Sequence, residues 1–141
     1  MSTTLNFNAK AFVRVLTIGA LALATSLSVR TASAQPQDYR FELDGQPVKS
    51  GKATLIKVRL VHVPDGKPVP GAIIIQTKLD MGPDGMTEMG APAKASPSSE
   101  PGLYQIEAQP SMAGRWGLTL AAKVQGETET VRGTVIVPVA K

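Results

Sequence analysis

Alternation of apolar and polar residues over short segments is the feature that most constrains the fold of this chain. Each of these segments is bounded by Gly, Pro or other turn residues. Six of them are clear: 39–43, 53–63, 72–81, 103–109, 116–124 and 131–139. Successive side chains of a strand point to opposite faces, so a period of two gathers the apolar residues of each segment on one face. The pattern predicts an all-β sandwich or barrel in which these faces share one core.

The interval between the third and fourth segments, residues 82–101, is long for a connection without structure. A short strand near 86–93 would divide it and raise the count to about seven, the number in a simple immunoglobulin-like two-sheet sandwich. Residues 91–101, "APAKASPSSEP", then form an exposed and flexible connection. Trp116 lies on a continuous apolar face and is predicted to be buried. The third segment is predicted to turn these residues toward the core: Ile73, Ile75, Thr77, Leu79 and Met81.

The first 34 residues have the pattern of a secretory signal peptide. Lys10 and Arg14 precede the thirteen-residue apolar run "VLTIGALALATSL", and "ASA" at 32–34 resembles a cleavage site. The run is short for a membrane span, which needs about 20 apolar residues; an uncleaved anchor is the alternative. We expect residues 1–34 to be removed, leaving residues 35–141 as one periplasmic domain without a stable membrane span.

Charge and residue inventory exclude several functions. Removing residues 1–34 takes away Lys10, Arg14 and Arg30 and no acid, which lowers the formal charge from +4 to +1. The basic balance of the whole chain is therefore no argument for nucleic-acid binding. The chain has one His, no Cys, and no Gly-rich phosphate-binding motif. Zinc-type ligand sets and nucleophile–histidine catalytic sets are not indicated, so the sequence predicts a protein that is not an enzyme.

Methionines in a turn-rich segment are the feature most suggestive of function. "LDMGPDGMTEMG" (79–90) contains Met81, Met86 and Met89, and Met112 lies in a second turn, "QPSMAG". Thioether sulfur is a soft, neutral ligand that selects Cu(I) over harder cations. Three acids interleaved with the methionines, Asp80, Asp84 and Glu88, would add a field that attracts a cation. The ordinary alternative is an adaptable apolar patch, formed by loop packing or by a partner-binding surface.

Strand succession decides which of these groups lie together. With seven strands, the third-to-fourth and fifth-to-sixth connections lie at one end of the sandwich, so Met112 joins the other methionines. With six strands, Met112 would move to the end that holds His62. His62 is expected on a strand next to that of Met81 and at its opposite end, ~25–30 Å away at about 3.3 Å per residue. It is predicted to be a hydrogen-bonded histidine at the edge of the core.

The motifs "DGKPVPGA", "DMGPDGM" and "GLYQIEAQPSMAGRWGLTL" together resemble the YtkA-like, or FixH-like, domain of exported bacterial proteins. The resemblance covers roughly residues 50 to 138. It implies an immunoglobulin-like sandwich and handling of copper or another heavy metal, with ligand roles for Met81, Met86, Met89 and Met112. Many members look to have histidine near the methionine loop, and this chain has none there, which favours Cu(I) over Cu(II).

Three hypotheses for function follow. The first is a periplasmic Cu(I)-binding domain that buffers copper or hands it over. The second is an interaction module whose methionine loop docks an efflux or oxidase-assembly partner, a periplasmic or membrane protein, without metal. The third is a sink for oxidants, since methionine sulfoxide formation is reversible.

Overall fold

The fold is a two-layer β-sandwich without α-helix in the residues that the computed structural model describes, 36–45 and 47–141. The predicted signal peptide, the mature start at Gln35 and the apolar run lie outside these residues. None of the described helices is long and apolar enough to cross a membrane. Two single-turn 3-10 helices occur, η1 (Pro36–Asp38) and η2 (Gly82–Asp84).

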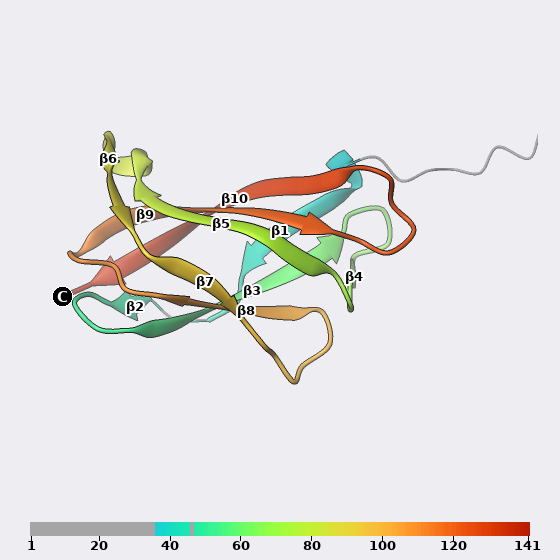
Figure 1. Ribbon diagram of the computed structural model, residues 1–141, viewed down its shortest axis with the longest axis horizontal. Helices are drawn as coiled ribbons and strands as arrows, with labels where there is room; N and C mark the ends of the chain where they lie inside the picture. The colour runs from blue at the N-terminus through green and yellow to red at the C-terminus, as the bar shows by residue number, and fades with distance from the viewer. Residues whose placement is uncertain (1–35, 46) are drawn as a thin grey trace, which may run out of the picture. The chain divides into compact units, whose positions relative to one another are not determined.

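The first sheet has the strand order β1-β3-β8-β7, and a short strand, β4, also pairs with β3. Its strands are β1 (Tyr39–Leu43), β3 (Thr54–His62), β4 (Lys67–Pro68), β7 (Ala93–Ser96) and β8 (Leu103–Ala108). The second sheet has the order β2-β10-β9-β5-β6. Its strands are β2 (Val48–Lys49), β5 (Ile73–Met81), β6 (Met86–Ala91), β9 (Gly114–Lys123) and β10 (Thr130–Ala140). Figure 1 shows the two layers.

This order is that of an immunoglobulin-like sandwich. If β6 and β7 are counted as one strand, the chain has seven main strands. The first, second, fifth and fourth form one sheet, and the third, sixth and seventh form the core of the other, which is the immunoglobulin arrangement. The pairs between these strands are antiparallel, and β2 runs parallel to the end of β10. The predicted fold class is therefore confirmed.

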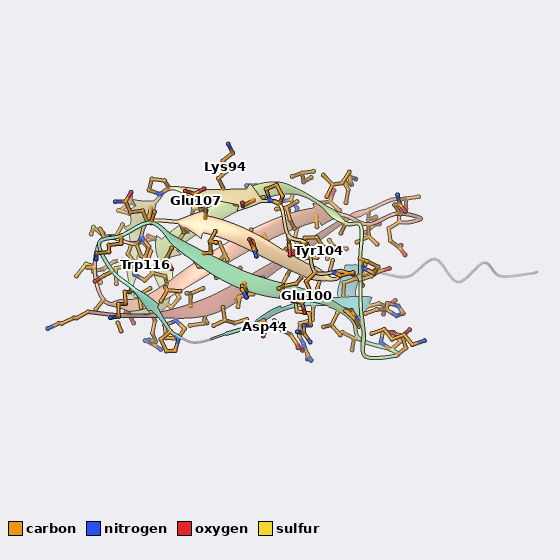
Figure 2. The ribbon with its side chains drawn as sticks, turned by 90° about the horizontal axis from the view of Figure 1, so that it is seen from below. Asp44, Lys94, Glu100, Tyr104, Glu107 and Trp116 are labelled. Carbon is orange, nitrogen blue, oxygen red and sulfur yellow. The ribbon has the colours of Figure 1, made fainter. Side chains whose placement is uncertain are left out.

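The core forms where the apolar faces of the two sheets meet. Alternation in β9 buries Trp116, Leu118, Leu120 and Ala122, and β3 buries Ile56, Val58 and Leu60. Trp116 is fully buried, as predicted, and lies inside the sandwich near one end (Figure 2). Its indole N–H donates to the carbonyl oxygen of Met112 at 3.1 Å, which removes the cost of burying an unpaired donor.

The predicted inward face of β5 is wrong in its first half. Ile73 and Ile75 are 66% and 53% exposed, whereas Ile74 packs against the core. The pairing of β5 with β9 shifts between Ile74 and Gln76, so the strand holds one extra residue there. A single extra residue moves all preceding side chains to the other face. Beyond this bulge Leu79 and Met81 are buried, as expected.

The predicted connection at 91–101 is also wrong in part, because Ala93–Ser96 form β7 and pair with β8. The strand expected near 86–93 is present, but it begins in the second sheet as β6 and continues in the first as β7, with Pro92 between them. Proline cannot donate to a ladder, so it suits the point at which a strand leaves one sheet for the other. Residues 97–102 remain as the connection to β8.

Candidate functional site

A tight hairpin between β5 and β6 carries three of the four methionines. Gly85 closes η2 with φ of +79°, a left-handed conformation that glycine adopts at low cost, and its N–H donates to the carbonyl oxygen of Gly82 at 2.9 Å. Met81 then pairs with Met86 across the hairpin. Asp80 pairs with Gly90, so residues 87–89 have no counterpart on β5 and form an excursion of β6. The backbone irregularity that would free Met86 and Met89 from strict alternation is therefore present.

Burial divides the four methionines into two kinds. Met81 is 1% exposed and belongs to the core cluster. Met86, Met89 and Met112 are 39%, 40% and 42% exposed. The hairpin thus buries the thioether of Met81 and exposes those of Met86 and Met89 to solvent. The turn before β9 exposes a third thioether, that of Met112.

The hairpin is fastened to the start of β9. The Asp84 carboxylate accepts hydrogen bonds from the Arg115 backbone N–H at 2.7 Å and from Arg115 Nε at 2.8 Å, and a second guanidinium nitrogen donates to the Pro83 carbonyl oxygen at 3.0 Å. The backbone N–H bond and the guanidinium lower the pKa of Asp84 below its ordinary value. Gly117 leaves room for the Pro83 ring, whose Cδ would lie 3.3 Å from a Cβ at that position.

A second glycine marks the closest approach. Gly114 has φ of +148°, and a Cβ built there would lie 2.5 Å from Met81 Cε and 2.9 Å from an Asp84 carboxylate oxygen. Met81, Asp84 and the residues before Trp116 are therefore packed together at this end. The seven-strand order places the β5–β6 and β8–β9 connections at the same end, as the parity argument predicted.

Two of the three acids interleaved with the methionines are paired with cations, which weakens the negative field that the sequence predicted. Asp80 accepts from the Lys78 ammonium at 2.8 Å and from the Gly82 N–H at 2.9 Å, and these two contacts lower its pKa. Asp84 is bound to Arg115. Asp80 and Asp84 thus stabilise the hairpin, and each is neutralised by a cation, Lys78 or Arg115.

His62 lies at the other end of the domain. Its Nδ1 is 2.9 Å from an Asp65 carboxylate oxygen, its ring lies 5.2 Å from that of Tyr39, and its side chain is 28% exposed. The expectation of a hydrogen-bonded histidine at the edge of the core is confirmed. The expectation that its strand neighbours that of Met81 is wrong, because β3 and β5 belong to different sheets.

The polar groups around His62 satisfy one another. The hydrogen bond with His62 lowers the pKa of Asp65. Tyr39 donates to a Glu127 carboxylate oxygen at 2.8 Å. Burial first, and then this carboxylate, raise the pKa of Tyr39 to about 12. These contacts stabilise the joint between β1, β3 and the turn before β10.

Arg115 is the site residue whose role the sequence did not reveal. Next to Trp116 it reads as a solvated charge at a strand edge, and its side chain is indeed 64% exposed. Its partner, Asp84, lies 31 residues earlier in the chain, so no local pattern joins the two.

Comparison with known families assigns the chain to one of them. The model of the family described as YtkA-like matches residues 33–121. The chain belongs to the YtkA-like family. Among curated proteins, none matches it significantly.

Solved structures resemble this YtkA-like chain only distantly. The ZirS C-terminal domain is 12% identical, with a TM-score of 0.42 over 100% of this chain and 88% of that one. The filamin domain of Lin-41 is 18% identical, with a TM-score of 0.42 over 77% of this chain and 98% of that one.

The methionine end offers three exposed thioethers and the exposed carboxylate of Glu88. Among the described residues no group of three or more His, Cys, Asp or Glu side chains could hold a metal ion. Thioether sulfur is a soft donor, which suits Cu(I) better than Zn²⁺ or Mg²⁺.

Proposed function

We propose that this YtkA-like protein is an exported, non-catalytic domain that binds one Cu(I) through methionine sulfur and buffers it or hands it over in the periplasm. The observation that carries the proposal is the similar exposure of Met86, Met89 and Met112, between 39% and 42%, on two connections at one end of the sandwich. Apolar side chains of this size are usually buried, and exposed ones that gather at one place mark a binding site.

The chemistry of the donors supports copper in its reduced state. A thioether is neutral and needs no deprotonation, so binding depends little on pH. A cluster of neutral sulfurs adds no charge to compensate a divalent ion, and Asp80 and Asp84 are already bound to Lys78 and Arg115. A soft monovalent ion is the cation that such a site favours.

The four methionines would have different duties. Met86, Met89 and Met112 would supply the sulfurs that face solvent. Met81, which the family resemblance also names, would hold the hairpin from beneath, with any ligation by its enclosed sulfur secondary. The Asp84–Arg115 contacts fix the hairpin against β9, which reduces the ordering cost of bringing the sulfurs together.

A Cu(I) competition titration against a chromophoric chelator tests this proposal. Met86 and Met89 replaced together by Leu should abolish binding, since Leu has a similar volume and no donor atom. Met112→Leu should weaken it, and Zn²⁺ should compete poorly with Cu(I). His62→Ala is the matched control, because it lies at the opposite end and should leave Cu(I) affinity unchanged. If the double Leu variant binds Cu(I) as tightly as the wild type, the copper proposal is wrong.

The same exposure favours a second candidate function, a docking surface for an efflux or oxidase-assembly protein without metal. Methionine side chains adapt to varied partners and are used on such surfaces. The two functions respond differently to substitution. Leu at 86 and 89 keeps an apolar patch and would preserve docking while removing copper, whereas Asp at the same positions would remove both.

A further inference from the structure

The outer edge of β5 is left open over the half of the strand that lies farthest from Met81. β6 pairs with β5 only from Leu79 to Met81, and no strand among the described residues pairs with the outer side of Ile73–Lys78. The cause is the passage of the chain at Pro92 from the second sheet to the first, where it becomes β7. An open edge presents backbone donors and acceptors that another strand can pair with.

This edge has little of the usual protection. Proteins commonly blunt open edges with charged residues, proline or bulges; here a bulge precedes Gln76 and Lys78 ends the edge, yet residues 73–77 read "IIIQT", with no charge and no proline. Ile73 and Ile75 are also among the most exposed large apolar side chains of the described residues. Their exposure follows from the bulge before Gln76, which turns both outward.

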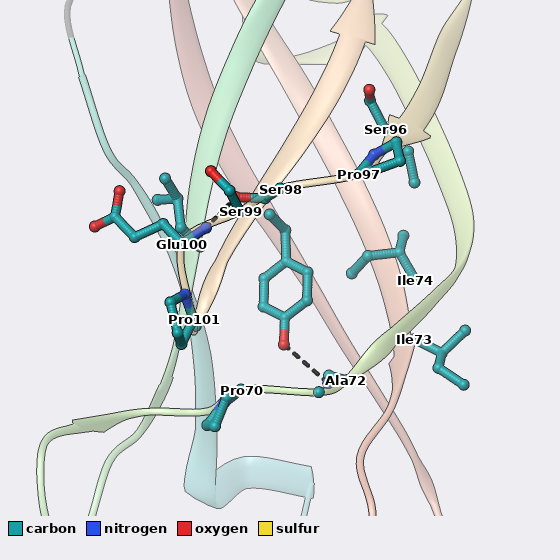
Figure 3. A pocket seen from close by; sticks show the side chains of 15 residues that line it. Pro70, Ala72, Ile73, Ile74, Ser96, Pro97, Ser98, Ser99, Glu100 and Pro101 are labelled. Atoms are coloured by element: carbon teal, nitrogen blue, oxygen red, sulfur yellow. Dashed lines mark hydrogen bonds between the residues drawn. The ribbon is translucent and has the colours of Figure 1, made fainter.

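The open edge borders a hollow between the two sheets. A cavity of about 630 Å³ is lined by Ile73 and Ile74 on one side and by residues 95–104 on the other. Figure 3 shows Ile74 pointing into this space, across from the segment Ser96–Pro101, whereas the Ile73 side chain points away from it. The Tyr104 hydroxyl forms part of the floor, donating to the Val69 carbonyl oxygen at 2.6 Å and accepting from the Ala72 N–H at 2.9 Å. A shallower groove continues along residues 74–77 and 93–95.

The charges around the open edge of β5 indicate what kind of partner strand could bind there. Between Asp65 and Asp80 the sequence has no acidic residue. Lys78 on β5 is paired with Asp80 at 2.8 Å, but Lys123 lies opposite Ile73 on β9, and Arg132 donates to the Gln76 side chain at 3.1 Å. On the other wall, Lys94 projects outward from β7, opposite Glu107 on β8 (Figure 2). Glu100 is the one acid among the residues that line the larger cavity. A second copy of this edge would bring the same cations together, which disfavours self-pairing.

We propose that the edge Ile73–Lys78 binds an extended peptide segment of a partner protein, in which apolar side chains alternate with acidic ones. The segment adds as a strand beside β5. Its apolar side chains enter the hollow beside Ile74, Ala95 and Tyr104, and its acidic side chains lie outward near Lys123 and Arg132. Main-chain pairing supplies affinity and the alternate side chains supply selectivity. The surface is separate from the methionine end, so it does not depend on copper binding.

The test uses a fluorescein-labelled synthetic peptide, Glu-Val-Glu-Val-Thr-Val-Glu, and fluorescence anisotropy with the purified protein. We expect saturable binding, slower amide hydrogen exchange at Ile73–Lys78, and no saturable binding of a peptide in which every Glu is replaced by Lys. Ile73→Glu and Ile75→Glu should each weaken binding about tenfold, because each places a negative charge beside the acidic peptide. Ile136→Glu is the matched control, since Ile136 is 48% exposed on β10, away from this edge, and the variant should bind the peptide as the wild type does.

Charge reversal sharpens the test. Lys94→Glu should lower the affinity for the acidic peptide and allow binding of the peptide that carries Lys in place of Glu. Near-UV circular dichroism from Trp116 confirms that each variant is folded before its affinity is read. The proposal is overturned if the wild type does not bind the acidic peptide, if Ile73→Glu binds it equally well, or if β5 amides are not protected. It is also overturned if the protein instead forms a dimer that Ile75→Glu abolishes, since the occupant would then be a second copy.

Discussion

The two ends of the sandwich differ in how their reactive side chains are satisfied. At the end that holds His62, polar side chains bond to one another: His62 with Asp65, and Tyr39 with Glu127. At the opposite end two carboxylates are equally well paired, Asp80 with Lys78 and Asp84 with Arg115, but three thioethers face solvent. A histidine is the more familiar metal ligand, yet here it serves the fold, and the residues left available are the methionines.

The largest effect should come from the enclosed methionine. Met81→Ala removes a side chain that is 1% exposed and leaves a cavity, so it should lower the free energy of unfolding by about 2–5 kcal/mol. Met89→Ala is the control and should change it by less than about 0.5 kcal/mol, because that side chain is substantially exposed. Urea denaturation followed by Trp116 fluorescence measures both. Equal losses in the two variants would mean that burial does not separate these methionines.

A smaller effect is expected at Gly114. Alanine there must adopt φ of +148° and place its Cβ against Met81 Cε, which should cost about 1–3 kcal/mol. Gly126→Ala tests the backbone term alone, since φ is +87° and no atom lies within 4 Å of the added Cβ. The part of the Gly114→Ala loss that comes from Met81 Cε should vanish in a Met81→Ala background, whereas the part from the Asp84 carboxylate oxygen, 2.9 Å from the added Cβ, should remain. Additive losses in the double variant would show that Gly114 and Met81 do not touch.

The smallest effect belongs to the histidine end. Tyr39→Phe removes the hydrogen bond to Glu127 and should cost about 1 kcal/mol at neutral pH. The folded protein raises the pKa of Tyr39 from 10.0 to about 12, so this stabilisation is complete below pH 10 and is lost as the pH rises toward 12. Urea midpoints of wild type and variant should therefore converge between pH 10 and 12. A constant difference across that range would contradict the role of the Tyr39 hydroxyl.

Alternation in the sequence predicted the layers and most of the core, because each inward face of β3, β9 and β10 is continuous. Trp116 and the shared end of the two methionine connections followed from the same pattern. Two features escaped it. The bulge in β5 depends on how that strand meets β9, and the passage at Pro92 depends on which sheet each half of the segment can pair with. Both are properties of partner strands rather than of local sequence.

The residue types of the candidate site were predictable from the sequence, but the ion pairs and hydrogen bonds that hold its hairpin in place were not. Glycine and proline around Met86 indicated a turn, and the turn is there. The acids appeared to be free to attract a cation, because their partners could not be read from spacing: Arg115 lies 31 residues from Asp84. His62 was placed at the correct end from a wrong assumption about sheets, since direction along the chain alone determines which end a residue reaches.

The parallel pairing of β2 with the end of β10 has a practical consequence for anyone purifying the protein. Val139 pairs with both Val48 and Gly114, so the last strand ends beside the turn that holds Met112. The described chain begins at the other end, where Tyr39 pairs with His62. The nine residues of β3 span ~30 Å between these ends. A polyhistidine purification tag after Lys141 would bring a row of imidazoles close to the sulfurs that we propose as copper ligands. A tag placed before Pro36 would join the chain about 30 Å away from them.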